Sequence, residues 1–153
     1  MLKVLYVVLI FLVGFMSAYL VNFYFDANSY SLGGSARAPS DFVLSDEIEV
    51  YPDRVVIELE NARLSRYAPT GSMVPVLDDY ANGINVKPKS EEQINVGDII
   101  TFHDNGNLIV HRVVAKEVDE NGIYFVTKGD NSFVSDGKIR FEDIEHKLVG
   151  LIY

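Results

Sequence analysis

Apolar residues cluster at the amino terminus of the chain and form short alternating runs elsewhere. Of the first 25 residues, 21 are apolar or aromatic, and the segment 4–25 has only three exceptions. A helix rises 1.5 Å per residue, so this segment spans roughly 33 Å, enough for a hydrocarbon core of about 30 Å. Aromatic residues near both of its ends suit the interfaces of a bilayer. We therefore predict a single N-terminal transmembrane helix as an anchor at residues 1–25.

A cleavable signal peptide is the alternative interpretation of this segment. The apolar core of a signal peptide is about 7–15 residues long and is followed closely by small residues. Here the core is longer, and the nearest A-x-A pattern, Ala36-Arg37-Ala38, lies well beyond its end. We therefore expect a retained, single-pass anchor in the cell membrane. Lys3 favours a cytoplasmic amino terminus, with the rest of the chain on the extracytoplasmic side.

The remainder of the chain divides into two segments that differ in composition and in hydrophobic pattern. Residues 26–46 are rich in Ser, Ala, Gly and Asn, which predicts a flexible tether. Residues 47–153 contain short β-branched runs bounded by turn residues, which predict strands. These runs cover residues 55–60, 99–102, 108–114, 123–126 and 148–153. Asn-Gly pairs at 105–106 and 121–122 predict two antiparallel hairpins.

The predicted fold class is therefore mainly β, with an all-β domain at 47–153 that closes on itself or packs as two curved sheets. Beyond the anchor, helical periodicity is not sustained, and a single short turn is expected at 141–146. The segment 78–96 is longer than a simple strand connection. It predicts either a β-excursion near a binding cleft or a surface loop.

Charge and cysteine content narrow the functional classes. The chain has 13 Lys+Arg against 22 Asp+Glu, with a net charge of −9. An acidic surface repels phosphate backbones, so no nucleic-acid binding is expected. The absence of cysteine excludes disulfide scaffolds, thiol catalysis and thiolate metal sites. His103, His111 and His146 lack ligand spacing, so neither a metal nor an organic cofactor is expected.

A turn around Ser72 is the first candidate for chemistry. Ser72 follows Gly71, and Pro75 prevents a helix from forming through the segment. Backbone N–H groups in a tight turn can point at one spot, which is what stabilising a developing oxyanion requires. Small hydroxylated turns are common, so this motif alone indicates no more than a turn.

His111, in the run 108–114, is the second candidate. A serine needs a neighbouring base to become a nucleophile, and an imidazole titrates near neutral pH. A histidine in a strand is more often structural, and a catalytic one needs a carboxylate to fix its tautomer. Asp130 and Asp136 are the candidates for that carboxylate, although their Gly/Asn/Asp-rich loop also suits solvated turns.

Four motifs then occur in one order along the domain. They are Gly71-Ser72-Met73-x-Pro75, Val96-Gly97-Asp98-Ile99-Ile100, Ile109-Val110-His111-Arg112-Val113-Val114, and Lys128-Gly129-Asp130-Asn131 with Asp136. Together with the amino-terminal anchor, they resemble the type I signal peptidases, and more narrowly the archaeal and endoplasmic-reticulum branch. The resemblance covers roughly residues 65–153. It implies a signal-peptidase-like all-β catalytic domain that cleaves signal peptides after small residues on the outer face of the membrane.

The resemblance also implies roles for individual residues. Ser72 would be the nucleophile, and His111 would be the general base where the bacterial branch has a lysine. Asp136 would orient the histidine, Asp130 would support the loop, and Thr70 would join the Ser72 N–H in the oxyanion hole.

A lysine base fits this sequence poorly. Lys116 lies past the β-branched run, on the same expected face as His111 but about 16 Å further along the strand. Lys128 lies in the loop that carries the aspartates.

The function predicted from these features is a membrane-anchored serine endopeptidase with a Ser nucleophile and a His general base. Its expected partners are preproteins bound in extended form and the lipid bilayer, while accessory subunits are unknown. Two alternatives stay open. One is a non-catalytic, membrane-tethered β module that binds partner proteins, and the other is a related processing protease with a narrow substrate range.

Overall fold

The computed structural model describes residue 6, residues 11–21 and residues 37–153 of the chain. The chain divides into two compact units, residues 1–33 and residues 34–153. Each unit is described by itself below.

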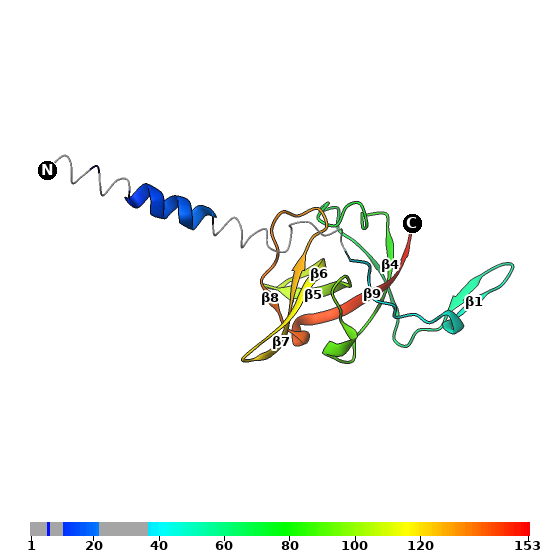
Figure 1. Cartoon of the computed structure of the whole chain (residues 1–153). Coiled ribbons are helices and arrows are strands. Elements are labelled where there is room, and N and C mark those ends of the chain that lie inside the picture. The colour runs from blue at the N-terminus through cyan, green and yellow to red at the C-terminus, as the bar shows by residue number, and fades with distance from the viewer. Residues whose placement is uncertain (1–5, 7–10, 22–36) are drawn as a thin grey trace. The chain divides into compact units, whose positions relative to one another are not determined.

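In the first unit, residues 11–21 are helical (Figure 1). None of the helices in the described ranges is both long enough and apolar enough to cross a membrane. About half of the anchor predicted at 1–25, and about half of the tether predicted at 26–46, lies outside the described residues.

The second unit is mainly β, which confirms this part of the predicted fold class (Figure 1). It contains a seven-stranded sheet in the order β3-β4-β9-β5-β6-β7-β8 and a two-stranded sheet, β1-β2, and neighbouring strands in both sheets are antiparallel. The strands are β1 (Ile48–Val50), β2 (Val55–Ile57), β3 (Arg63–Arg66), β4 (Asn82–Val86), β5 (Ile99–Asp104), β6 (Asn107–Asp119), β7 (Gly122–Lys128), β8 (Lys138–Ile139) and β9 (Ile144–Ile152). A short 3-10 turn at Ser45–Glu47 precedes β1, and two others, at Glu91–Gln93 and Phe141–Asp143, lie between β4 and β5 and between β8 and β9.

Both predicted hairpins are confirmed. Asn105 and Gly106 join β5 to β6 with φ values of 47° and 79°, and Gly122 begins β7 with a φ of 102°. Asparagine and glycine adopt this left-handed backbone region at low cost, which is why the Asn-Gly pairs mark these turns.

The strand order departs from a simple meander. Two runs of consecutive strands, β3 to β4 and β5 to β8, are separated because β9 inserts between β4 and β5. The C-terminal strand therefore lies inside the sheet, and β3 and β8 are the sheet edges within the described part of the chain.

The segment 78–96, expected to be either a β-excursion or a surface loop, contributes the strand β4 to the sheet, at a position that the sequence analysis did not specify. β4 pairs with β3 on one side and with β9 on the other. Its sequence, NGINV, is dominated by residues typical of turns, so local preference predicts no strand. Tertiary packing overrides that preference, since Asn85 and Val86 are each 2% exposed. Gly83 is required there, because a Cβ would lie only 1.8 Å from the Tyr67 hydroxyl.

Two apolar clusters form most of the core. The larger cluster contains Ile94, Ile100, Phe102, Val113, Phe125, Ile139 and Ile144. The second, called here the turn-side cluster, contains Met73, Leu77, Ile99 and Leu148. Adjacent residues of β5, Ile99 and Ile100, point into different clusters because side chains alternate along a strand.

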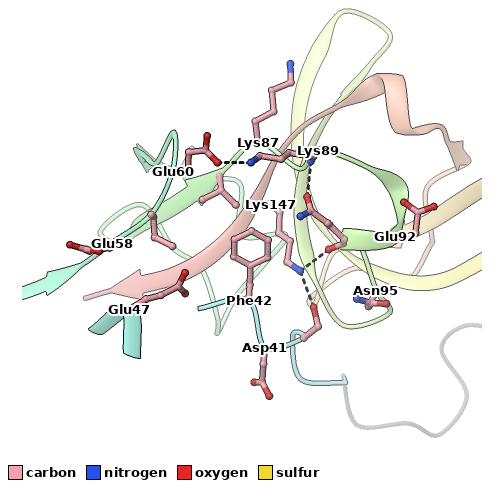
Figure 2. Close-up of a pocket in the computed structure, with 14 residues that line it drawn as sticks. Asp41, Phe42, Glu47, Glu58, Glu60, Lys87, Lys89, Glu92, Asn95 and Lys147 are labelled. Atoms are coloured by element: carbon pink, nitrogen blue, oxygen red, sulfur yellow. Dashed lines mark hydrogen bonds and ion pairs between the residues drawn. The ribbon is translucent and has the colours of Figure 1, made fainter. Parts of the chain in front are cut away.

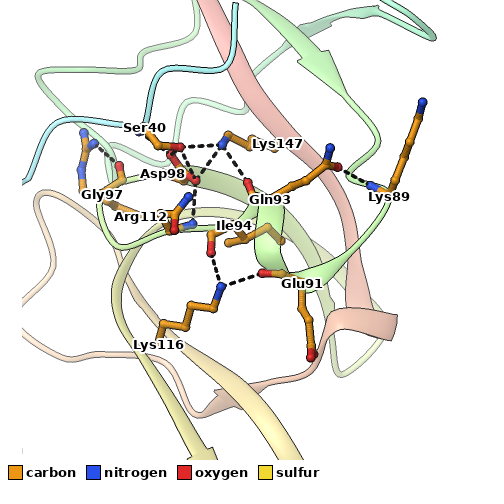
Figure 3. A network of polar contacts seen from close by, with 11 residues as sticks. Ser40, Lys89, Glu91, Gln93, Ile94, Gly97, Asp98, Arg112, Lys116 and Lys147 are labelled. Carbon is orange, nitrogen blue, oxygen red and sulfur yellow. Dashed lines mark hydrogen bonds and ion pairs between the residues drawn. The ribbon is translucent and has the colours of Figure 1, made fainter.

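A buried ion pair lies at the centre of a polar network in the β unit (Figure 3). Lys147 Nζ is 2.8 Å from Asp98 Oδ2, and the two side chains are 1% and 0% exposed. Lys147 also donates to the Ser40 hydroxyl and to Gln93 O, while Asp98 accepts hydrogen bonds from the N–H groups of Ser40 and Asn95. Every polar atom of the pair therefore has a partner, which offsets part of the cost of burying the charges.

The same network holds part of the predicted tether against the β unit. Ser40 donates to Asp98 through both its N–H, at 2.7 Å, and its hydroxyl, at 2.9 Å. Gly97 has a φ of 107°, and a Cβ at this position would lie 2.2 Å from Ala38 O. Residues near Ser40 are thus packed on the β unit, although their composition predicts a flexible tether.

Replacing Lys147 should test the importance of this pair. Lys147→Ala should lower the free energy of unfolding by about 3–5 kcal/mol, because the Asp98 carboxylate would stay buried without its counter-ion. Urea denaturation of the full chain in detergent micelles measures this loss. Lys138→Ala is the matched control and should cost far less, since Lys138 is 55% exposed where it pairs with Asp119. Equal losses in the two variants would contradict the assignment.

Candidate active site

The residues before and after Ser72, Gly71 and Met73, both restrict the conformation of the turn that carries it. Gly71 has a φ of 72°, a backbone region in which a side chain would cost roughly 1–2 kcal/mol. Met73 is only 4% exposed and packs in the turn-side cluster. The N–H groups of Val76 and Leu77 both donate to Met73 O at 2.9 Å, which closes one tight turn after the serine. The Ser72 backbone is therefore held by the core beneath it.

Thr70 is the immediate polar neighbour of Ser72. The two hydroxyl oxygens, Thr70 Oγ1 and Ser72 Oγ, are 3.2 Å apart. The Ser72 N–H also points at Thr70 Oγ1, at a long 3.4 Å. A hydroxyl and a weakly bound N–H next to one serine are the groups that a developing oxyanion needs.

His111 is held by a carboxylate. His111 Nδ1 lies 2.7 Å from Asp136 Oδ2, and the two side chains are 13% and 23% exposed. The same Asp136 oxygen accepts a hydrogen bond from the Thr127 hydroxyl at 2.7 Å, and the Asp136 N–H donates to Thr127 O at 2.8 Å. A carboxylate at Nδ1 fixes the ring orientation and leaves Nε2 to exchange a proton with another group.

The loop after β7 brings the serine and the histidine to the same place. The Asn131 N–H donates to Ser72 O at 2.8 Å, and the Asn131 side chain donates to Gly71 O at 3.1 Å. A Cβ placed on Gly129 would lie 2.6 Å from Ser72 O and 3.1 Å from His111 Nε2. Gly129 is thus flanked by the backbone of the serine and by the free nitrogen of the histidine.

Ser72 and His111 are close without being hydrogen-bonded to each other. In the described part of the chain, the hydrogen bond of Ser72 Oγ is with Thr70, and none joins it to His111. Catalytic hydrogen bonds are often long before substrate binds and tighten in the substrate complex.

Asp130 lies in the same loop but faces another residue. The Arg112 guanidinium donates two hydrogen bonds to the Asp130 carboxylate, from Nε to Oδ1 at 2.8 Å and from Nη2 to Oδ2 at 2.7 Å. Arg112 Nη1 also donates to Gly97 O at 2.8 Å. The paired side chains of Arg112 and Asp130 are 6% and 10% exposed, so this bidentate pair fastens the loop to β6.

Neither nearby lysine contacts Ser72. Lys116 Nζ donates to Glu91 O at 2.8 Å and to Ile94 O at 2.9 Å (Figure 3). Lys128 Nζ donates to Ser132 O at 2.8 Å within its own loop. Both ammonium groups are therefore engaged with backbone carbonyls, away from the serine hydroxyl.

A cavity of about 500 Å³ contains both Ser72 and His111 in its lining. Its wall is largely apolar, with Tyr67, Met73, Leu77, Leu108, Ile109 and Val110 among the contributors. Burial raises the pKa of the Tyr67 hydroxyl, so that group stays neutral at physiological pH. The sequence analysis missed these lining residues because nothing in the sequence alone shows that the segment after β3 faces the start of β6.

One border of this cavity is a free strand edge. The first part of β6, Asn107–His111, pairs with β5, whereas pairing with β7 begins only at Arg112. Within the described residues, no strand pairs with the other side of this first part. An extended peptide could add there as a further strand.

The side chains of the described residues were also compared with the ligand sets that bind metal ions. The described residues contain no group of three or more His, Asp or Glu side chains arranged to hold a metal ion.

One comparison with curated proteins is informative. The signal peptidase complex catalytic subunit SEC11 of Yarrowia lipolytica (strain CLIB 122 / E 150) is 30% identical over 91 residues, which are 54% of this chain and 51% of the relative. The chain thus spans about half the length of the curated relative it matches. No family model matches, and neither does any solved structure. The homology confirms the resemblance to the type I signal peptidases of the endoplasmic-reticulum-like branch, and it supports a signal-peptidase-like function.

The close approach of Gly129 to Ser72 O and His111 Nε2 can be tested by replacing Gly129 with alanine and comparing the same change at Gly137. In Gly129→Ala the new Cβ should displace Ser72 O, and the overpacking should cost about 1–3 kcal/mol. The imidazole NMR signals of His111 should shift as well, since the ring is the neighbouring group. Gly137→Ala, at the end of the same loop with no atom within 4 Å, should change neither stability nor those signals. Unchanged His111 signals in Gly129→Ala would show that the loop does not set the ring position.

Proposed function

We propose that this chain is a membrane-anchored serine endopeptidase that removes signal peptides from exported preproteins after small residues. The observation that carries the proposal is the shared cavity lined by Ser72 and His111, with Asp136 bound to the far nitrogen of the imidazole. The homology to a signal peptidase catalytic subunit supports the same reaction class.

The proposed chemistry uses four groups. His111 Nε2 takes the proton of Ser72 as the hydroxyl oxygen attacks the carbonyl carbon of the scissile bond. Asp136 stabilises the imidazolium that forms, and the Ser72 N–H together with the Thr70 hydroxyl binds the oxyanion. The imidazolium then protonates the leaving amine, and water releases the acyl group by the reverse sequence.

Substrate recognition would combine a strand edge with an apolar cavity. The free edge of Asn107–His111 offers backbone groups to an extended segment. Side chains before the cleaved bond would enter the cavity over Met73 and Leu77, where the lining is largely apolar. This arrangement suits small apolar side chains.

Anchoring is proposed from the sequence. The apolar segment 4–25 is long enough to hold the chain in the cell membrane in one pass, with a cytoplasmic amino terminus. The catalytic unit would then work on the extracytoplasmic side, where tethering raises its effective concentration near emerging signal peptides.

Removal of the nucleophile or the base provides the direct test. Ser72→Ala and His111→Gln should each lower kcat for a model preprotein by at least about 10³-fold, since neither group can act without the other. The assay uses the full chain in membranes of a host that lacks other signal peptidases. Ser45→Ala, an exposed serine without a side-chain hydrogen bond, is the control and should cleave normally.

The outcomes of this assay separate the three functions. Equal processing by wild type and Ser72→Ala would contradict the mechanism. No cleavage of any preprotein by a folded wild-type chain would favour a non-catalytic binding module. Cleavage restricted to one or a few preproteins would indicate a narrow-substrate protease.

The oxyanion role of Thr70 predicts a separate effect. Thr70→Val should lower kcat by about 10²-fold with little change in KM, because it removes a donor that acts on the transition state. Thr70→Ser keeps the hydroxyl and should recover most of the rate. An unchanged kcat in Thr70→Val would assign the oxyanion to backbone donors alone.

A further inference from the structure

A second cavity, outside the candidate active site, has several charged side chains in its lining. A cavity of about 590 Å³ is lined by residues that precede or begin β3, follow β4, or lie in β9. The charged and titratable members are Arg63, Lys87, Lys89, Glu145 and His146. None of them lines the cavity that contains Ser72.

The sheet register explains why the basic residues meet. Arg63 pairs with Asn85 across β3 and β4, and Asn85 pairs with Leu148 across β4 and β9. Residues two positions apart on a strand share a face, so His146 lies on the side of Leu148 in β9, and Lys87 directly follows β4. Arg63, Lys87 and His146 therefore meet in the lining of one cavity at this end of the sheet.

Two of these cations lack a protein counter-ion. In the described residues, the side chains of Arg63 and Lys87 form no ion pair and no hydrogen bond, whereas Lys89 is paired with Glu60. Figure 2 shows Lys89 reaching Glu60 beside a separate cavity, which Lys87 also lines. Carboxylates outnumber cations in this chain, with 22 Asp+Glu against 13 Lys+Arg, so unpaired cations that converge on one cavity are unexpected.

The pKa of His146 reports which charges lie around its imidazole. Burial is the main cause that lowers this pKa, Glu145 raises it, and Arg63 and Lys87 each lower it. Two cations from separate segments thus act on the same imidazole.

We propose that Arg63, Lys87 and His146 form a binding site for a phosphate-type oxyanion. Each side chain can donate a hydrogen bond, and donors that are charged form the stronger, shorter bonds. The oxygens of a phosphate group point in tetrahedral directions, so donors that approach from different segments can reach separate oxygens, whereas the two oxygens of a carboxylate lie in one plane. The group can be free inorganic phosphate or the phosphodiester headgroup of an anionic phospholipid, since both present a tetrahedral phosphorus oxyanion.

The test follows the His146 imidazole by NMR in the full chain. In maltoside micelles, sodium phosphate is titrated at constant ionic strength, with sodium chloride as the reference salt. In the second arm, nanodiscs of phosphatidylcholine alone are compared with nanodiscs that also contain phosphatidylglycerol. Inorganic phosphate should shift the His146 signals saturably in the first arm if the free ion binds. Phosphatidylglycerol should produce the shift without added phosphate if the lipid headgroup binds.

Charge-removing variants complete the test. Arg63→Gln/Lys87→Gln should weaken binding about tenfold or more, because two charge-assisted contacts are lost. Lys87→Gln alone should show a smaller loss and serves if the double variant folds poorly. Arg54→Gln, an exposed arginine between β1 and β2, should leave the affinity unchanged. No saturable shift in either arm, or equal affinities of the wild type and the folded double variant, would overturn the proposal.

Discussion

The contact between the loop after β7 and the Ser72 turn is the interaction on which the candidate site depends. Ser72 and His111 come from different parts of the chain, and neither side chain is bonded to the other. Their separation is set instead by the loop, which is fastened at three points. Asn131 binds the carbonyls of the serine turn, the Arg112 guanidinium holds Asp130, and Asp136 is bound to Thr127. Because one loop touches both residues of the candidate site, a small shift of its backbone would change their geometry together.

Two Gly-Asp pairs show the same structural device. In each, the glycine allows a close backbone approach, of Ala38 O to Gly97 and of Ser72 O to Gly129. The aspartate that follows is buried against a cation on a strand: Asp98 with Lys147 of β9, and Asp130 with Arg112 of β6. Burying ion pairs contributes little net stability. Their evident effect here is positional, since one pair secures the chain near Ser40 and the other secures the loop beside Ser72.

The sequence was sufficient for features that depend on local chemistry and insufficient for those that depend on packing. The Asn-Gly hairpins were predictable because their turns need positive φ. The position of β4 was not predictable, since the sequence NGINV forms a strand only because it pairs with β3 and β9. Motifs singled out Ser72, His111, Asp130 and Asp136 as candidates, but no spacing indicated which aspartate faces the imidazole. The apolar wall of the cavity depends on distant segments meeting, and a single sequence holds no signal for that.

β6 explains why the cavity lies where it does. Its first part pairs with β5 alone, and the partner on its other side begins at Arg112. His111 is the last residue before that change, so it lies beside an open edge while its neighbour Arg112 is already buried at 5% exposure. An imidazole next to an unpaired edge can meet a peptide backbone added as a strand, and under the proposed function the same peptide would approach Ser72 across the cavity. A second strand along the whole of β6 would stabilise the sheet but would close this edge. The incomplete pairing of β6 is therefore the feature that makes the site accessible.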